Sequence, residues 1–437
     1  MAKAGEETQI SCRFITKLPD VYRVPPSTVA VPSQLHRYGL SQIINHLLAL
    51  EPQRPFDFLL DGELVRESLE GFLLSHGISA EKVLEIEYIF SVEPAKPEQQ
   101  HRHNDWVSAV AARSACILSG SYDGTVKTWR GAQLTSTVAL HRGPVTAAAA
   151  LPEAQGPLAL TGGQDATVLL SSVPALAAEP DNAGAAEAQP LVAYREHTDA
   201  VTGIAVSPEG ALLVSASWDT SLRIWPTGSA VAERAREEDA ATAKHETGAK
   251  RKKGAAGAAM PSAPSVEASK QELSGHSQAV SSVAWPSPET ILSGSWDNSV
   301  RRWDAEICTC TERHDGSKAV YCIAAAPAGS QLVAFGGAEH ALHIWDPRTP
   351  VSKETDQKLY SSHTHWISSV AWHPVSEHHV VSASYDNSLK LWDIRAAIPL
   401  HTLQGHSEKV LCVAWSGLDS FVSGGADCLL RSYTVSV

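Results

Sequence analysis

The 437-residue sequence lacks a long apolar run and an excess of basic residues. Nowhere do about 18 apolar residues follow one another, so no membrane-spanning helix is expected. The opening MAKAGEETQI carries acidic residues and no apolar core, so a secretory signal is not expected. The 35 Lys and Arg against 48 Asp and Glu give a net charge of −13, which argues against broad electrostatic wrapping of nucleic acid.

Paired cysteines and the common catalytic motifs are also absent. The seven cysteines are scattered and form no CxxC pair, which suits a reducing compartment better than a disulfide framework or a zinc site. The sequence contains no P-loop, HExxH, GxSxG or dinucleotide-binding fingerprint. We therefore expect a non-enzymatic protein without a cofactor and without a metal of its own.

What the sequence does contain is an internal repeat. Residues 275–304 include GHSQAVSSVAW and ILSGSWDNSVRRWD, and residues 362–393 include SHTHWISSVAWHP and VVSASYDNSLKLWD. Both copies have a His, a V-A-W strand, an aromatic–Asp turn and a Trp six residues after the Asp. This template occurs seven times, and its turn acids are Asp123, Asp165, Asp219, Asp297, Glu339, Asp386 and Asp427.

Each copy predicts strands joined by Ser, Gly, Asp and Asn turns, in which the turn acid accepts backbone N–H bonds. The repeat resembles the WD-repeat family, whose unit of about 40–45 residues folds as a four-stranded propeller blade. In that family the turn Asp also holds a His of the preceding loop. Seven near-copies of a His–Asp pair indicate a structural network rather than a catalytic triad. The matching histidines are His103, His141, His197, His276, His363 and His406, with His314 two residues out of step in the fifth copy.

The array also predicts how the ring closes. The last copy has room for three strands, and the stretch EPAKPEQQHR before His103 occupies the outer-strand position of the template. We expect that stretch to complete the last blade, because an open sheet edge is prone to pair with other chains. The predicted propeller covers residues 94–437.

Two insertions, 172–190 and 226–270, interrupt the array and are expected to be disordered. The longer one contains no Leu, Ile, Phe, Trp or Tyr and cannot bury a core. It carries the basic cluster Lys250, Arg251, Lys252 and Lys253, a candidate nuclear-localisation signal. A solvated charge run explains the cluster equally well.

Large aromatic residues directly before several turn acids form a candidate partner surface. They are Tyr122, Trp218, Trp296 and Tyr385. Exposed aromatic side chains often anchor partners. The alternative is that each packs on the neighbouring blade, and the sequence does not decide which face of the ring meets a partner.

Residues 8–93 follow a different pattern. Two strands, a helix with apolar residues at helical spacing in HRYGLSQIINHLLAL, a strand–turn–strand in FDFLLDGELVR, a short helix ending at Gly77 and a last strand predict a ubiquitin-like β-grasp domain. No Gly-Gly ends the unit, so we expect a docking module rather than a conjugated modifier. The predicted fold is mainly β, a seven-bladed WD-repeat propeller preceded by this α+β domain.

The phrases RYGLSQIINHLL, PFDFLLDGELVRESL and VLEIEYI, followed by seven WD repeats, resemble the family of WD-repeat subunits of the PeBoW complex. The resemblance implies a nuclear and nucleolar scaffold for large (60S) ribosomal subunit assembly and pre-rRNA maturation. It implies that the propeller binds the block-of-proliferation protein and, through the complex, Pescadillo and the pre-60S particle. It also implies that the ubiquitin-like domain docks on the metal site of midasin, an AAA+ ATPase that releases the complex.

In that family a glutamate of the G-E-L turn is a ligand, in trans, to the metal held by midasin. The matching residue is Glu63. An Asp-Gly pair favours a tight turn, which places the next residue near a protruding tip, and hard cations prefer carboxylate oxygens. Asp61 and Glu67 are nearby competitors, and an exposed turn glutamate kept for solubility is the alternative. A ubiquitin-system substrate adaptor is the alternative function, and direct RNA contact stays open.

Overall fold

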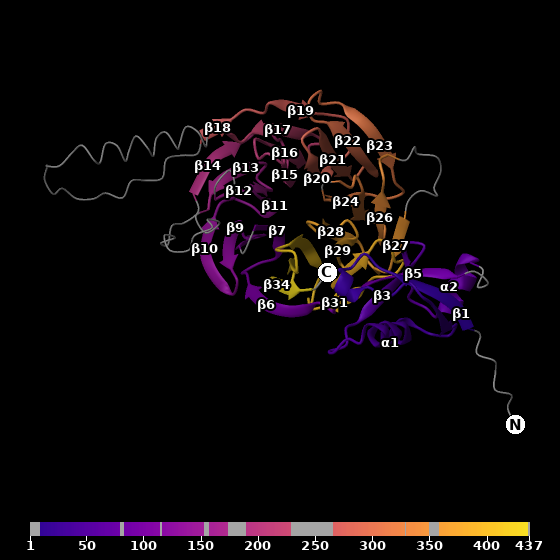
Figure 1. Cartoon of the computed structure of the whole chain (residues 1–437). Coiled ribbons are helices and arrows are strands. Elements are labelled where there is room, and N and C mark those ends of the chain that lie inside the picture. Colours follow the sequence, from indigo (N-terminus) through magenta and orange to yellow (C-terminus); the bar gives the residue numbers. More distant parts are fainter. Residues whose placement is uncertain are drawn as a thin grey trace, which may run out of the picture. The chain divides into compact units, whose positions relative to one another are not determined.

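The computed structural model describes residues 9–78, 83–113, 116–152, 157–173, 189–228, 265–327, 329–348 and 358–435. The chain divides into two compact units (Figure 1). The N-terminal unit consists mainly of the residues up to Pro94 together with Asp393–Leu400. The propeller unit consists mainly of Ala95–Trp392 and His401–Val435. Among the described residues, no helix has the length and apolar character needed to cross a membrane.

The N-terminal unit is a five-stranded mixed sheet with two helices. Its strands and helices are β1 (Gln9–Ile15), β2 (Thr28–Pro32), α1 (Arg37–Leu48), β3 (Phe56–Leu60), β4 (Glu63–Leu64), α2 (Leu69–His76) and β5 (Leu84–Phe90), with the short 3-10 turn η1 (Asp20–Tyr22) after β1. The strand order is β2-β1-β5-β3-β4, with β1 parallel to β5 and the other neighbours antiparallel. This is the β-grasp arrangement, and it confirms the predicted ubiquitin-like fold.

Local sequence explains these elements. Strand β1 alternates exposed and buried residues, as expected for a strand with one face on a core. Helix α1 turns Leu40 and Ile44 toward that core at i, i+4 spacing. Ser68 caps the start of helix α2, where its hydroxyl accepts the Gly71 N–H, and Gly77 follows the helix in the left-handed region that glycine tolerates.

The described residues of the propeller unit form seven sheets, as predicted, and each contains four antiparallel strands. Blade 1 contains β7 (Val107–Arg113), β8 (Cys116–Ser121), β9 (Thr125–Arg130) and β10 (Gln133–Ala139). Blade 2 contains β11 (Val145–Ala150), β12 (Leu158–Gly163), β13 (Val168–Ser172) and β14 (Gln189–Tyr194). Blade 3 contains β15 (Val201–Val206), β16 (Leu212–Ser217), β17 (Leu222–Pro226) and β19 (Gln271–Leu273).

Blades 4 to 7 continue the ring. Blade 4 contains β20 (Val280–Ser287), β21 (Thr290–Ser295), β22 (Ser299–Asp304) and β23 (Cys310–Asp315). Blade 5 contains β24 (Val320–Ala325), β25 (Val333–Gly337), β26 (Ala341–Trp345) and β27 (Lys358–Ser361). Blade 6 contains β28 (Ile367–Trp372), β29 (His379–Ser384), β30 (Ser388–Asp393) and β31 (His401–Gln404). Blade 7 contains β32 (Val410–Trp415), β33 (Ser420–Gly425), β34 (Leu429–Thr434) and β6 (Lys96–Arg102).

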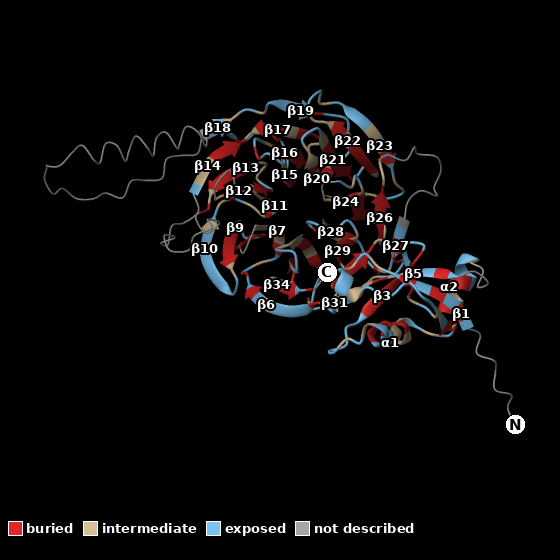
Figure 2. Ribbon diagram, in the orientation of Figure 1, coloured by how far each residue is buried: buried red, intermediate tan, exposed pale blue. Residues whose placement is uncertain are grey.

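Burial follows position in the blade. The second and third strands of the blades are largely buried, whereas outer strands such as β6, β10 and β23 are largely exposed (Figure 2). The core therefore lies between adjacent blades. Each blade buries its apolar faces on its neighbours, so the ring is stable only as a closed set.

Strand β6 closes the ring, as predicted. It pairs antiparallel with β34 from Lys96↔Thr434 to Arg102↔Leu429. The side chain of Val107 in blade 1 packs so closely on Gly424 in blade 7 that a Cβ at Gly424 would lie 2.5 Å from Val107 Cγ1. The closing blade therefore joins the first segment of the array to the last.

The predicted insertion boundaries were wrong at their ends. Ser172 ends β13, and β14 begins at Gln189, so only 174–188 lie outside the described residues. In the longer insertion, residues 265–267 form β18 (Ser265–Glu267), a fifth strand parallel to β14 of blade 2. Backbone pairing to an exposed sheet edge needs no apolar core, which is why composition did not predict it. Residues 229–264, including the basic cluster at 250–253, lie outside the described residues.

Candidate functional site

The Asp-Gly turn between β3 and β4 presents Glu63. Asp61 and Gly62 have φ angles of 52° and 86°, the left-handed pair that a two-residue hairpin turn requires. Leu60 pairs with Glu63 across this turn. The Glu63 side chain is 50% exposed, so its carboxylate is accessible from outside the unit.

A histidine from α2 holds the Glu63 carboxylate. Nε2 of His76 lies 2.9 Å from Oε2 of Glu63, while the His76 ring stacks on Phe72 with ring centroids 4.1 Å apart. The pKa of His76 is raised, first by its hydrogen bond to the Phe72 carbonyl and then by Glu63. A carboxylate with one oxygen engaged by an imidazole can offer its other oxygen to an external cation.

Of the two competitors for this role, Asp61 lies in the turn itself and Glu67 lies just before α2, and both are exposed. The structure thus brings several acidic side chains near one tip, and Glu63 is the one that pairs with His76. Sequence reasoning did not find His76. Its only signal is a histidine in the last turn of a short helix, which is common at helix ends.

The N-terminal unit also buries a small apolar cluster beside this turn. Leu59 and Leu64 pack with Ala396, and the Leu64 N–H donates to the Arg395 carbonyl at 3.1 Å. Strand β4 is a sheet edge, and this bond satisfies part of it. The apolar surface next to Glu63 is therefore covered from within the unit.

The His–Asp pairs form buried networks in blades 2, 3, 4, 6 and 7. His Nδ1 donates to a turn-acid oxygen at 2.8–3.1 Å, and a hydroxyl of the second strand donates to Nε2 at 2.7–2.9 Å. The pairs are His141–Asp165, His197–Asp219, His276–Asp297, His363–Asp386 and His406–Asp427. With both ring nitrogens engaged, these histidines have no nitrogen left for a substrate.

Blades 1 and 5 depart from this pattern. In blade 1, His103 keeps its bond to Ser119, but Asp123 accepts from Thr125 instead of from His103. Among the described residues, Nδ1 of His103 has no hydrogen-bond partner. In blade 5, Glu339 lies 3.3 Å from His343 and accepts from the Ser317 hydroxyl. The expectation that the turn acid holds the loop His in every blade was wrong there, because the longer Glu339 reaches other partners and His314 lies in β23.

The aromatic candidates gather on the face that carries the Asp turns. Tyr122, Trp218 and Trp296 are 39–40% exposed, and Tyr385 is half-buried. Their rings belong to two contact series, Trp106–Tyr122 and Trp218–Trp296–Tyr321–Trp366–Tyr385, with centroids 5.2–6.2 Å apart. Sequence reasoning missed Tyr321, which occupies a strand position where most copies have Ser or Thr.

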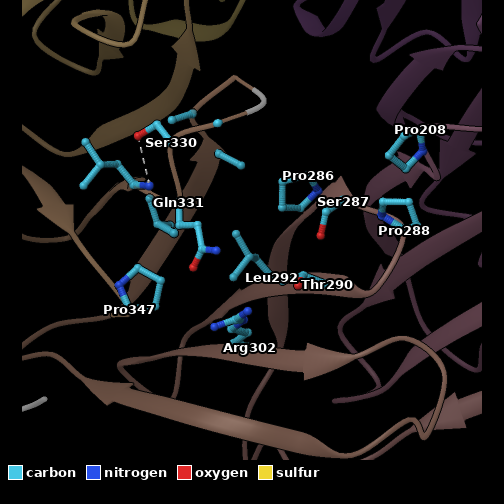
Figure 3. A pocket seen from close by; sticks show the side chains of 15 residues that line it. Pro208, Pro286, Ser287, Pro288, Thr290, Leu292, Arg302, Ser330, Gln331 and Pro347 are labelled. Atoms are coloured by element: carbon cyan, nitrogen blue, oxygen red, sulfur yellow. Dashed lines mark hydrogen bonds between the residues drawn. The ribbon is translucent and has the colours of Figure 1, made fainter. Parts of the chain in front are cut away.

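A cavity of about 370 Å³ lies among strands and loops of blades 3, 4 and 5 (Figure 3). Prolines such as Pro208, Pro286 and Pro347 line it together with Arg302, whose Nη1 bonds Glu312 at 3.3 Å. The described residues that line this cavity include no His, Cys, Asp or Glu. The cavity thus offers no general acid or base.

Comparisons with known proteins agree with both units. The family model described as "NLE (NUC135) domain" matches residues 10–73, and "WD domain, G-beta repeat" matches 96–130, 188–226, 268–304, 355–393 and 397–434. A "Ribosome biogenesis protein WDR12 homolog" of Chlamydomonas reinhardtii is 43% identical over 98% of both chains. The chain belongs to the WDR12 family of ribosome biogenesis proteins. The homologue of that description in Oryza sativa subsp. japonica is 39% identical over 97% of this chain and 95% of its own length, and that of Arabidopsis thaliana is 38% identical over 98% and 97%.

The matched repeat segments leave out the first three strands of blades 2 and 5 of this WDR12-family chain. In blade 2, Ser171 stands six residues after the turn acid, where the other blades have Trp or Tyr. In blade 5, Glu339 replaces the turn Asp. Both blades nevertheless form four antiparallel strands, so packing between neighbours compensates for the weaker local pattern.

As the pH is lowered, the propeller of this WDR12-family chain should lose stability at pH values above those at which its carboxylates take up protons. Burial lowers the pKa of His276 and His363, and lowers that of His103 to about 4. The unfolded chain takes up these protons near pH 6.5 while the folded chain does not, so the free energy of unfolding falls as the pH drops below 6.5. Burial opposes ionisation of Asp297 and Asp386, but hydrogen bonds from Ser and His outweigh it and lower their pKa. That adds a second loss of stability as the pH falls through about 4.

Urea unfolding followed by tryptophan fluorescence measures this effect, because all 12 Trp lie in the propeller. The urea midpoint is expected to fall steadily between pH 7 and pH 4.5, and to fall less in His103→Gln than in the unaltered chain. A midpoint that is constant over this range contradicts the assignment of buried neutral histidines.

A single buried hydroxyl anchors the blade 6 network. Ser382 is fully buried, accepts the Trp392 indole N–H at 2.8 Å and donates to His363 Nε2 at 2.7 Å. Ser382→Ala leaves two buried nitrogens unpaired, so we expect a loss of about 2–4 kcal/mol in the free energy of unfolding. Urea unfolding checks this, with Ser317→Ala at an exposed position as the control. Equal midpoints for the two variants would show that the network does not stabilise the blade.

Proposed function

We propose that this WDR12-family chain is a non-enzymatic adaptor in the assembly of the large (60S) ribosomal subunit and the maturation of its pre-rRNA. The observation that carries the proposal is the full-length similarity to ribosome biogenesis proteins, with both units in the same order. The closed ring supplies a rigid surface for partners. The buried His–Asp networks and the cavity in Figure 3 supply no catalytic arrangement.

The propeller is proposed to bind the block-of-proliferation protein and, through it, Pescadillo and the pre-60S particle. The exposed aromatic side chains at Tyr122, Trp218 and Trp296 support a partner surface, since aromatic anchors dominate many interfaces. We place this assembly in the nucleolus and nucleoplasm. The cluster at 250–253 is the proposed nuclear-localisation signal.

The N-terminal unit is proposed to dock on the metal site of midasin through Glu63, with Asp61 beside it in the turn. Three observations support this role: the left-handed turn that projects Glu63, its half-exposed side chain and the imidazole that holds one carboxylate oxygen. ATP hydrolysis by midasin would then pull the chain and its partners from the particle. The chemistry required of this chain is one carboxylate oxygen offered to a hard cation.

A ubiquitin-system substrate adaptor is the alternative. Receptors of ubiquitin-like domains need an accessible apolar patch on the sheet. Here Leu59 and Leu64 are buried against Ala396. This coverage favours docking through the acidic turn over docking through an apolar patch.

Conditional depletion of the chain in living cells tests the assembly role. We expect precursors of the large-subunit rRNAs to accumulate and free 60S subunits to fall, while 40S subunits keep their normal level. Restoration by the intact chain controls for indirect effects. Normal 60S levels after complete depletion would overturn the proposal.

A further inference from the structure

The cavity in Figure 3 lies on the face of the propeller opposite the Asp turns. Its lining comes largely from connections between the first and second strands of three neighbouring blades. Pro208 connects β15 to β16, residues 286–290 lead from β20 into β21, and residues 329–332 connect β24 to β25. In an antiparallel sheet these connections lie at the end opposite the turn between the second and third strands, which carries the turn acid. The cavity is therefore separate from the aromatic side chains of the Asp-turn face.

The walls of the cavity are apolar and stiff. They include Leu292 and four proline rings, those of Pro208, Pro286, Pro288 and Pro347. In the view of Figure 3, Pro288 and Pro347 lie on opposite sides of Arg302. Proline has almost no side-chain entropy to lose when it is covered, so an apolar guest does not have to order these walls. The volume of about 370 Å³ is also within the range of about 300–1,000 Å³ that is typical of ligand pockets.

Arg302 supplies the one charged side chain among the described residues that line the cavity. Its side chain is 26% exposed, and its Nη1 bonds Glu312 Oε1 at 3.3 Å. Within the described part of the chain, Nε and Nη2 of Arg302 have no hydrogen-bond partner. These two nitrogens lie on one side of the planar guanidinium and can bind both oxygens of a carboxylate. The cavity thus combines apolar walls with a carboxylate-binding group.

Acidic residues beside the cavity restrict the guest to a single negative charge. Glu209 and Glu289 each directly follow a proline that lines the cavity, and both are exposed. Like charges brought together at an interface are repelled, so these acids disfavour a phosphate group or a run of acidic residues. One carboxylate next to an apolar group is the chemistry that fits both the walls and the charges.

We propose that this cavity binds a short segment of a partner protein in which an apolar side chain lies within two residues of one Asp or Glu. The apolar side chain occupies the space among the proline rings, and the carboxylate accepts hydrogen bonds from Nε and Nη2 of Arg302. The inference goes beyond the proposed function, because neither docking through Glu63 nor the aromatic surface of the Asp-turn face involves this cavity.

A peptide library tests the proposal. A randomised twelve-residue library is selected on the full chain and counter-selected on the Arg302→Gln chain. We expect the retained peptides to share an apolar residue within two positions of an Asp or Glu. Replacing that acid with Asn or Gln should lower the affinity at least about tenfold, because charge-assisted hydrogen bonds are the stronger ones. Retained peptides that lack an acid, or that bind equally well as the amide, overturn the proposal.

Exposed Gln331 provides a second test that leaves Arg302 in place. Gln331 lines the cavity, and a substitution at an exposed position should not unfold the blade. We expect Gln331→Glu to weaken binding of the selected peptides and Gln331→Lys to strengthen it, each by about two- to fivefold, as for an exposed charge pair. Equal affinities for these two chains also overturn the proposal.

A matched control and a folding measurement complete the experiment. Arg313→Gln, at an arginine of β23 that pairs with Asp315, should bind the selected peptides like the unaltered chain. Thermal unfolding should show that the Arg302→Gln chain is folded. A library that yields no peptide dependent on Arg302 overturns the proposal as well, and it leaves the Glu63 docking and the 60S role unaffected.

Discussion

A chain that starts at His103 is expected to lose the cooperative unfolding of its propeller, whereas a chain that starts at Ala95 keeps it. The difference between them is β6, whose pairing with β34 completes blade 7. The His101 ring of β6 also stacks on Trp129 of blade 1 with centroids 4.4 Å apart. Removing β6 exposes both the edge of blade 7 and the face of Trp129, and a ring whose blades depend on their neighbours does not tolerate such a gap.

Urea unfolding by tryptophan fluorescence and size-exclusion chromatography measure this. The chain from Ala95 is expected to be monomeric with one sharp transition. The chain from His103 is expected to aggregate, or to unfold at a far lower urea concentration over a broad range. Equal transitions for the two chains would show that the ring closes without β6.

Glu63→Gln is expected to trap the chain on pre-60S particles. The substitution keeps the shape and most of the packing of the side chain but replaces a charged carboxylate with a neutral amide. We expect metal-dependent docking to weaken by more than roughly 100-fold, since even outer-shell partners of metal ligands are worth 10–100-fold. Folding should be unaffected, because the side chain is half exposed.

Affinity purification of pre-60S particles from cells that carry each variant measures the trapping. In cells with Glu63→Gln, the amount of this chain per pre-60S particle should be higher than in cells with the unaltered chain. More of the late particles should also still contain it. Glu67→Gln, at a neighbouring exposed carboxylate, is the matched control and should behave normally. If Glu67→Gln traps the chain on the particles and Glu63→Gln does not, Glu67 and not Glu63 is the docking residue.

Features set by local sequence could be predicted. The Asp61-Gly62 turn was predicted because Asp and Gly tolerate positive φ angles. In the structure both residues have positive φ angles. The repeat predicted seven blades and the pairing of the EPAKPEQQHR stretch with the last one, because each blade needs the same four strands. In both cases the feature depends on residues of one turn or one repeat, which the sequence shows directly.

Features set by contacts distant in sequence could not be predicted. His76 meets Glu63 only because α2 packs beside β4, and no spacing indicates that meeting. Strand β18 depends on a free edge of blade 2 that exists only after folding.

Direct binding between the purified chain and the metal-ion-dependent adhesion domain of midasin tests the central claim. Isothermal titration with Mg²⁺, with excess chelator, and with the Glu63→Gln and Glu67→Gln chains separates the contributions. We predict binding that requires Mg²⁺, that Glu63→Gln abolishes and that Glu67→Gln leaves intact. Binding that survives both the chelator and Glu63→Gln would contradict this prediction, because the Glu63 carboxylate would then not be the proposed metal ligand.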